Sequence, residues 1–317
     1  MEIGVREERK KKMYTFLLQV EKNGHYSEDT ATIARLIDER NWLNFNDEPM
    51  RIKECRFKGL TEKIAKDTIP VGSVEFVNKA LRLGYGAGPM QPINIPPSLF
   101  HEDYLGRKCE VVKDKVGVKK LFLKWNTNKI FLKSNSKIKA GYTDFYTLRD
   151  NIPDDSEYFV SEPVDIVSEW RCFVYRNSLK GVKNYSGDPW VLPSRGFVED
   201  CIKEVGNDIV AYTLDVVVLK SGRSVVLEVH NFVSCGLYGF DDAAIIPMLI
   251  NGFKREILTK NYKNSSSHTC SECEFFLGGG DWNLCCEKEH KGYPCGFLCY
   301  EDTPVCEMFE KKKKKKE

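Results

Sequence analysis

The spacing of apolar residues over the first 105 positions predicts a small α/β unit. An apolar run at 13–20 is typical of a strand. The apolar residues within 30–43 recur at helical spacing, and Thr30 is placed to act as the N-cap of a helix there. The first predicted pair of elements is therefore a strand followed by a helix.

A second helix is predicted over 73–84, because its apolar residues again fall three and four positions apart. Ser73 can cap the start of this helix, and Gly84 can end it. This alternation of strand and helix is typical of an open α/β lobe. A stretch rich in Gly and Pro follows at 84–100 and predicts a domain boundary.

Beyond this boundary, short apolar runs rich in β-branched and aromatic residues predict mainly strands. The runs at 121–125 and 130–134 are predicted strands separated by a turn at 126–128. The clearest hairpin lies at 211–231, where two valine-rich runs flank Lys-Ser-Gly-Arg. Further strands are predicted within 157–167 and 169–187, with a turn at 177–181, and helices are predicted at 198–207 and 243–262.

Composition agrees with a folded protein of more than one domain. The chain has 317 residues, of which 42% are hydrophobic and 30% charged, which excludes a fibrous repeat or a fully disordered chain. We predict an α/β lobe at 1–105, a second domain at 106–262, a cysteine-rich module at 268–309 and a lysine-rich tail at 310–317. No apolar run approaches the roughly 18 residues of a membrane helix, and the N-terminus lacks the apolar core of a secretory signal, so a cytoplasmic protein is expected.

The net charge of +2 conceals an uneven distribution. Removing the six lysines Lys311–Lys316 changes the net charge to −4, so the remaining chain is mildly acidic. Residues 113–139 nevertheless contain nine lysines and one aspartate, including Lys124, Lys133 and Lys139. Such a stretch can bind phosphate groups, although a solvated basic surface is the more common explanation for any one lysine.

Asp215 and Glu228 lie on the two arms of the predicted 211–231 hairpin, each among apolar residues. A buried carboxylate is costly unless it is paired or binds a metal, and Mg²⁺ prefers such oxygen ligands. His230 points to the same face as Glu228, whereas Asn231 points away unless the strand ends there. The alternative is an edge strand with two solvated acids.

Two glutamates and an arginine lie in the preceding strands. Glu162 and Glu169 are seven residues apart, and Arg171 follows within a strand-like run. The planar guanidinium can bind a phosphate or carboxylate through two hydrogen bonds. A structural salt bridge with a nearby acid is the alternative for Arg171.

Residues from about 106 to 255 resemble an ATP-grasp domain, most of all the phage and bacterial ATP-grasp proteins of poorly defined substrate. The stretches that carry the resemblance are IFLKSNSKIKAGYTDF, YFVSEPVDIVSEWRCFV and YTLDVVVLKSGRSVVLEVHNFVSCGLYG. The resemblance implies two α+β subdomains that clamp a nucleotide, here preceded by the small α/β lobe. It also implies an ATP-dependent ligase that forms an acyl phosphate on a small-molecule or peptide carboxylate, which an amine or thiol then attacks.

The resemblance also implies roles for individual residues. Lys133, with Lys124 or Lys139, is similar to the lysines that contact ATP phosphates, and Arg171 to the arginine that steadies the phosphate or acyl phosphate. Glu162 to Val164 resemble the hinge that binds adenine, and Glu169 the acid that binds ribose. Asp215 and Glu228 resemble the Mg²⁺ ligands, but His230 stands where the family usually has Asn, and Asn231 substitutes only if the strand bulges. Pro163 removes one hinge donor.

The loop at 232–240 follows the acidic pair. Gly236 and Gly239 permit close approach of the backbone to a ligand, so Cys235 and Tyr238 are candidates to line an acceptor pocket. An ordinary glycine-rich turn explains the same residues equally well.

Seven of the twelve cysteines fall in the last 50 residues: Cys270, Cys273, Cys285, Cys286, Cys295, Cys299 and Cys306. This spacing is typical of a zinc module, with an iron–sulfur cluster as second choice and disulfides third. So small a segment needs a metal to fold alone. With the lysine tail it could contact a protein or nucleic acid, and a non-catalytic nucleotide-binding protein that uses this module is the alternative to a ligase.

Overall fold

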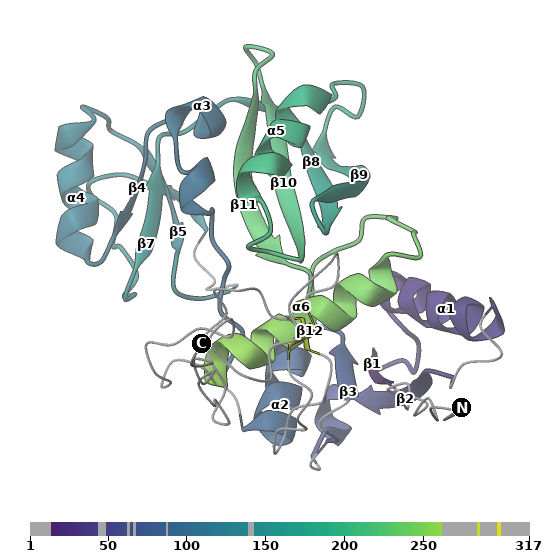
Figure 1. The fold of residues 1–317 in the computed structure, drawn as a ribbon. Helices are drawn as coiled ribbons and strands as arrows, with labels where there is room; N and C mark the ends of the chain where they lie inside the picture. The colour runs from purple at the N-terminus through teal and green to yellow at the C-terminus, as the bar shows by residue number, and fades with distance from the viewer. Residues whose placement is uncertain are drawn as a thin grey trace, which may run out of the picture. The chain divides into compact units, whose positions relative to one another are not determined.

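A computed structural model describes residues 14–43, 49–61, 64–65, 68–86, 88–138, 143–261, 284–285 and 297–298, with side chains up to position 254 (Figure 1). The chain divides into two compact units, Met1–Lys254 and Arg255–Glu317. In the second unit the description covers the end of helix α6 (Ile245–Asn261) and two antiparallel two-residue strands, β12 (Leu284–Cys285) and β13 (Phe297–Leu298).

The first unit begins with a three-stranded parallel sheet in the order β2-β1-β3. Its elements are β1 (Thr15–Val20), α1 (Glu28–Leu43), β2 (Arg51–Arg56), the 3₁₀ helix η1 (Phe57–Gly59), β3 (Thr68–Val71) and α2 (Val74–Tyr85). The predicted strand, both helices and the α/β alternation are confirmed. Parallel strands need crossover connections, and α1 supplies the one between β1 and β2.

The ends of the two helices differ from prediction. The hydroxyl of Ser27 accepts a hydrogen bond from the amide of Thr30, so Ser27 precedes α1 and Thr30 lies inside it, buried. Ser73 caps α2 as predicted, through its hydroxyl and the amide of Phe76. Helix α2 runs past Gly84 to Gly86, whose φ of 62° is the left-handed conformation of a helix C-cap.

A second, antiparallel sheet has the order β4-β7-β5-β6. It contains β4 (Cys109–Val112), β5 (Ile130–Ser134), β6 (Asp144–Tyr146) and β7 (Tyr158–Ser161), and α4 (Lys115–Lys124) packs on one face. The predicted strand at 121–125 is wrong, because most of it is the last turn of α4. Asp114 caps that helix, and Val118, Leu121 and Phe122 are buried at helical spacing while Leu123 is exposed.

A third sheet, also antiparallel, has the order β11-β10-β8-β9. Its strands are β8 (Ile166–Tyr175), β9 (Ser178–Gly187), β10 (Ala211–Leu219) and β11 (Ser224–Asn231). Helix α5 (Arg195–Val205) packs on one face together with η2 (Pro97–Leu99) and α3 (Glu102–Leu105). Both predicted hairpins are confirmed, but the β8–β9 turn is Arg176–Asn177, which have positive φ, rather than 177–181.

A β-bulge decides which residues of β11 face the site. Asp215 pairs with Glu228, but its neighbour Val216 pairs with Val226, so Leu227 is the extra residue. Val226 and Val229 both lie in the core beside α5. In a regular strand Glu228 would share the face of Val226, and the bulge instead turns Glu228 to the opposite face.

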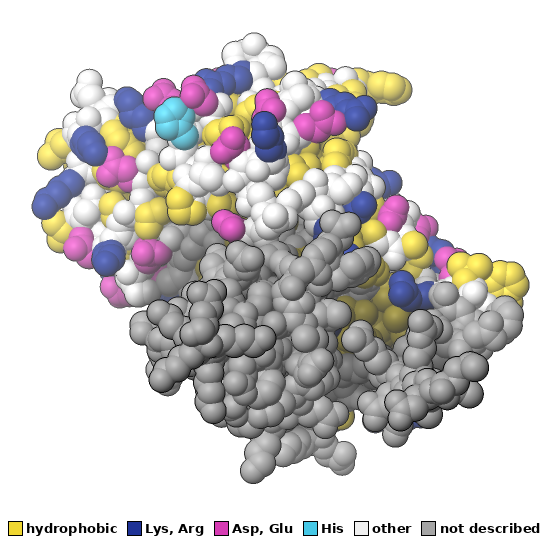
Figure 2. Space-filling view, viewed as in Figure 1, with side chains coloured by type: hydrophobic (Ala, Val, Ile, Leu, Met, Phe, Trp, Pro, Cys, Tyr) yellow, Lys and Arg dark blue, Asp and Glu magenta, His cyan; other side chains and the backbone are white. Residues whose placement is uncertain are grey.

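The basic stretch predicted at 113–139 is largely paired in the structure. Ion pairs join Lys115 to Asp154, Lys124 to Glu110, Lys133 to Glu228 and Lys137 to Asp155. On the face shown in Figure 2, acidic and basic side chains are interspersed over the described surface. Among the described helices, none combines the length and apolarity needed to cross a membrane.

Candidate functional site

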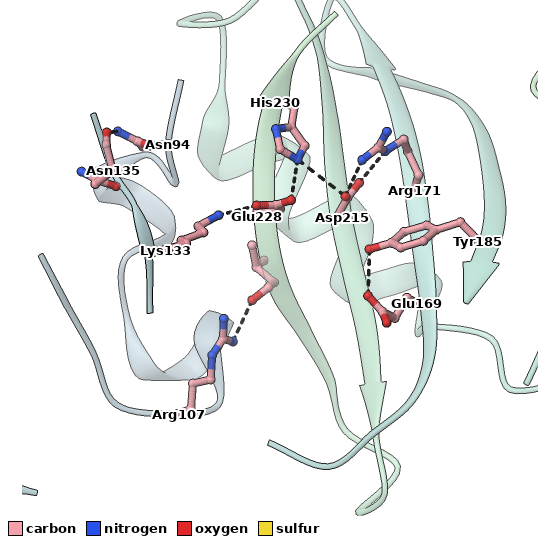
Figure 3. A network of polar contacts seen from close by, with 11 residues as sticks. Asn94, Arg107, Lys133, Asn135, Glu169, Arg171, Tyr185, Asp215, Glu228 and His230 are labelled. Carbon is pink, nitrogen blue, oxygen red and sulfur yellow. Dashed lines mark hydrogen bonds and ion pairs between the residues drawn. The ribbon is translucent and has the colours of Figure 1, made fainter. Parts of the chain in front are cut away.

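Three neighbouring strands bring an arginine and two acids to the same level of the third sheet. Asp215 on β10 pairs with Arg171 on β8 and with Glu228 on β11 (Figure 3). Residues directly opposite in antiparallel strands have Cβ atoms about 5 Å apart. The register and the bulge at Leu227 therefore place these side chains side by side on the face away from α5.

Arg171 and Asp215 form a buried ion pair with two hydrogen bonds. Nε of Arg171 donates to Oδ1 of Asp215 at 2.8 Å and Nη2 donates to Oδ2 at 2.7 Å, while Nη1 donates to the carbonyl of Gly236 at 3.2 Å. Burial lowers the pKa of Arg171, but the hydrogen bonds and charge of Asp215 outweigh it and the net shift is upward. The guanidinium is therefore permanently charged and fixed in orientation.

Glu228 binds two basic groups from different parts of the fold. Lys133 of β5 crosses from the second sheet and forms an ion pair with it, and Nε2 of His230 lies 2.6 Å from Oε1 of Glu228. Burial raises the pKa of Glu228, but Lys133 and His230 outweigh this effect and hold the pKa well below that of a free carboxyl group. Glu228 is therefore ionised at neutral pH.

Asp215, Glu228 and His230 can together hold a divalent cation. One donor atom from each lies within 4.8 Å of the others, and Nε2 of His230 is 3.9 Å from Oδ2 of Asp215. Thr213 pairs with His230 in the register, and its fully buried hydroxyl has no hydrogen-bond partner among the described residues. Two carboxylates, an imidazole and an unpaired buried hydroxyl fit a bound cation with associated water.

An aromatic pair covers Arg171. The rings of Tyr185 and Tyr238 stack with centroids 5.1 Å apart, and the Arg171 guanidinium lies 5.6 Å and 5.1 Å from the two centroids. The hydroxyl of Tyr185 donates to Oε2 of Glu169 at 3.0 Å. Sequence reasoning missed Tyr185, because no motif marks it and its orientation depends on a bulge where β9 pairs with β8.

The predicted hinge connects the second and third sheets. Glu162 and Val164 lie between β7 and β8, where the chain passes from one sheet to the other. The carboxylate of Glu162 accepts a hydrogen bond from the amide of Lys108 at 3.0 Å and pairs with its ammonium at 3.1 Å. Glu162 thereby ties the connection to the segment that precedes β4.

Other predicted site residues lie elsewhere. Lys124 ends α4, which packs on Leu132, so Lys124 and Lys133 lie on opposite faces of the second sheet. Asn231 faces away from His230, and its amide donates to the carbonyl of Gln91 at 3.3 Å. Lys139 is outside the described residues.

The predicted metal-binding cysteines also lie outside the described residues, except that the backbone of Cys285 belongs to β12. The zinc or iron–sulfur module, and its contact with a protein or nucleic acid, therefore stay predictions.

Residues 104–248 match a family model of the ATP-grasp domain, the second family of its clade. No curated protein matches the chain significantly.

Among solved structures, the fold is similar to an ATP-grasp RimK domain protein from Sphaerobacter thermophilus DSM 20745, with 15% identity, coverage of 76% of this chain and 97% of the other, and a TM-score of 0.44. D-cycloserine synthetase DcsG shows 11% identity, 76% and 99% coverage and a TM-score of 0.43. D-alanyl-alanine synthetase A from Vibrio cholerae O1 biovar eltor str. N16961 shows 10% identity, 77% and 98% coverage and a TM-score of 0.43.

Proposed function

On the premise of an ATP-grasp domain at residues 104–248, we propose that this chain is an ATP-dependent ligase. The terminal phosphate of ATP is transferred to a carboxylate oxygen of the substrate, which gives an acyl phosphate and ADP. An amine or thiol then attacks the acyl carbon, inorganic phosphate leaves, and a proton is released. The observation that carries this proposal is the cluster of Lys133, Glu228, Asp215 and Arg171 across two sheets.

The residues of the cluster divide the work of charge neutralisation. Lys133 pairs with the ATP phosphates, and Asp215, Glu228 and His230 hold a divalent cation such as Mg²⁺, which neutralises phosphate charge when bound. Arg171, kept rigid by Asp215, faces the charge that develops on the transferred phosphate and the acyl group. Positioning and electrostatics supply the catalysis, and no side-chain nucleophile is needed.

The remaining contacts fit the rest of the nucleotide. Glu169 would bind the ribose hydroxyls, and the connection from Glu162 to Val164 would bind adenine through its backbone. Pro163 has no amide hydrogen, so the adenine contacts in this connection depend on the other residues.

The ion pair between Lys133 and Glu228 supports the same proposal. In the structure these two groups neutralise each other. A phosphate would replace Glu228 as the partner of Lys133, and a cation would replace Lys133 as the partner of Glu228. A metal–nucleotide complex supplies both partners at once, so neither charge is left unpaired.

ATP binding by two matched lysine variants tests the proposal. We expect Lys133→Met to weaken ATP binding by about tenfold or more in calorimetry, because a hydrogen bond to a charged group contributes roughly 1.5–3 kcal/mol. Lys124→Met, on the opposite face of the sheet, should stay within about twofold of the wild type. Absence of ATP binding by the wild type, or equal effects of the two variants, would contradict the proposal.

A further inference from the structure

We infer that the divalent-cation site prefers a first-row transition metal ion over Mg²⁺, and that His230 causes this preference. The inference deepens the proposed function, on which it rests for the presence of a working cation site. It concerns the chemistry of the donor set of Asp215, Glu228 and His230.

The third donor of this set is a ring nitrogen. Nε2 of His230 lies toward both acids, 2.6 Å from Oε1 of Glu228 and 3.9 Å from Oδ2 of Asp215 (Figure 3). Mg²⁺ is a hard cation that takes oxygen ligands, whereas imidazole is a good ligand for first-row transition metals. Exchanging an oxygen donor for this nitrogen therefore favours the transition metals selectively.

A nearby amide oxygen does not replace the nitrogen. Asn231 is the adjacent residue, but strand alternation places it on the other face, where its amide donates to Gln91. The described part of the cluster therefore offers one imidazole and two carboxylates.

The charges around the two carboxylates act in the same direction. Arg171 neutralises Asp215, and Lys133 neutralises Glu228. A cation that is held mainly by electrostatic attraction, as Mg²⁺ is, gains less from acids that are already paired. The bond to the imidazole nitrogen does not depend on that charge, so it contributes a larger share of the binding of a transition metal ion.

The unpaired hydroxyl of Thr213 is an independent sign that a ligand belongs at this position. It is fully buried on the face of His230 and Asp215, directly opposite His230, and it has no partner among the described residues. A buried polar group without a partner is rare and costs about 1–3 kcal/mol. A water molecule bound to a cation at this site would satisfy it.

Mn²⁺ is the best probe for a direct test. The seven cysteines of residues 270–306 would capture Zn²⁺, while Mn²⁺ has little affinity for thiolates. The full chain without an affinity tag is titrated with Mn²⁺ in the absence of nucleotide, with the signal of free Mn²⁺ followed by electron paramagnetic resonance. Mg²⁺ affinity is then measured by competition, which gives the ratio of the two dissociation constants.

Three proteins are compared: the wild type, His230→Asn and, as a matched control, His101→Asn, whose histidine is exposed beside α3. We expect His230→Asn to lower the preference for Mn²⁺ over Mg²⁺ by about tenfold or more, mainly through weaker Mn²⁺ binding. His101→Asn should keep the wild-type ratio. If His230→Asn does not fold, His230→Gln supplies the same test with a longer amide.

An unchanged ratio in the His230 variant, or no Mn²⁺ binding by the wild type, would overturn the inference. ATP binding is measured on the same samples. An unchanged metal ratio with intact ATP binding overturns the metal preference alone, whereas a changed ratio without ATP binding overturns the proposed function alone.

Discussion

Arg171 binds both carboxylate oxygens of Asp215 from the neighbouring strand, at 2.8 Å and 2.7 Å. Asp215 also lies within reach of Glu228 and His230, so one carboxylate joins the cation site to the guanidinium. Each carboxylate oxygen has a second lone pair, and Asp215 can therefore serve both partners. The position of Arg171 relative to a bound cation is thus determined by this single side chain.

The first prediction concerns the stability that this ion pair provides. Arg171→Met should lower the free energy of unfolding by about 3–5 kcal/mol, because it leaves the charge of buried Asp215 without compensation. Arg171→Lys should not restore it fully, since an ammonium cannot reproduce the two parallel hydrogen bonds. Urea unfolding followed by circular dichroism measures the effect.

The control for this variant is Arg195→Met, which breaks an exposed pair with Glu199 within α5. Surface pairs contribute little, so its unfolding curve should match that of the wild type. Equal losses in the Arg171 and Arg195 variants would show that the buried pair has no special role.

The second prediction is a dependence of stability on acid pH that comes from Glu228. Because the pKa of Glu228 is lower in the folded protein than in the unfolded chain, the unfolded state binds more protons in acid. The stabilisation is fully present above the unfolded pKa of about 4.3 and is lost as the pH falls below it. Glu228→Gln should therefore flatten the loss of stability between pH 5 and the acid limit of folding. A slope identical to that of the wild type would contradict this.

The third prediction concerns the thiols of Cys109 and Cys235. Burial raises the pKa of Cys109 to about 11 and that of Cys235 to about 12, so almost no thiolate is present at pH 8. We expect iodoacetamide to label both positions more than about a hundredfold more slowly in the folded protein than in urea. Peptide mapping by mass spectrometry separates them from the other cysteines. Rapid labelling of Cys235 in the folded protein would instead indicate an activated thiol beside Arg171.

Local pattern predicts the hairpin that carries the acids, because its two arms are continuous β-branched runs that few other structures can bury. It fails at 121–125, where a short apolar run has no clear period and the cap at Asp114 decides for a helix. With that change Lys124 moves to the face opposite Lys133, and it leaves the candidate site.

Contacts between distant segments are the part that local pattern does not predict. The pairing of Arg171 with Asp215, and the bulge that turns Glu228 toward them, depend on strand register. Lys133 meets Glu228 only because the second sheet faces β11, and Tyr185 reaches Glu169 through a second bulge. Residue type indicates the chemistry of the site, but its connections result from tertiary packing.

The last prediction concerns Gly181 of β9, which lies directly opposite Phe173. A Cβ atom at this position would lie 2.5 Å and 2.7 Å from two ring carbons of Phe240. The Phe240 ring stacks on Phe173 with centroids 4.0 Å apart, and it ends the 232–240 loop whose Gly236 carbonyl accepts a hydrogen bond from Arg171. Gly181→Ala should therefore displace the loop and loosen its contact with the guanidinium.

We expect Gly181→Ala to lower the free energy of unfolding by about 1–3 kcal/mol, as overpacking of a core does, and to reduce ATP turnover further than the stability loss explains. Gly196→Ala is the matched control, since Gly196 lies in α5 with free space around it and alanine there should stabilise the fold by about 0.4–1 kcal/mol. Urea unfolding and an ATP turnover assay on both variants provide the comparison. If Gly181→Ala keeps wild-type stability and turnover, then Phe240 can move without cost and the loop does not depend on its stack with Phe173.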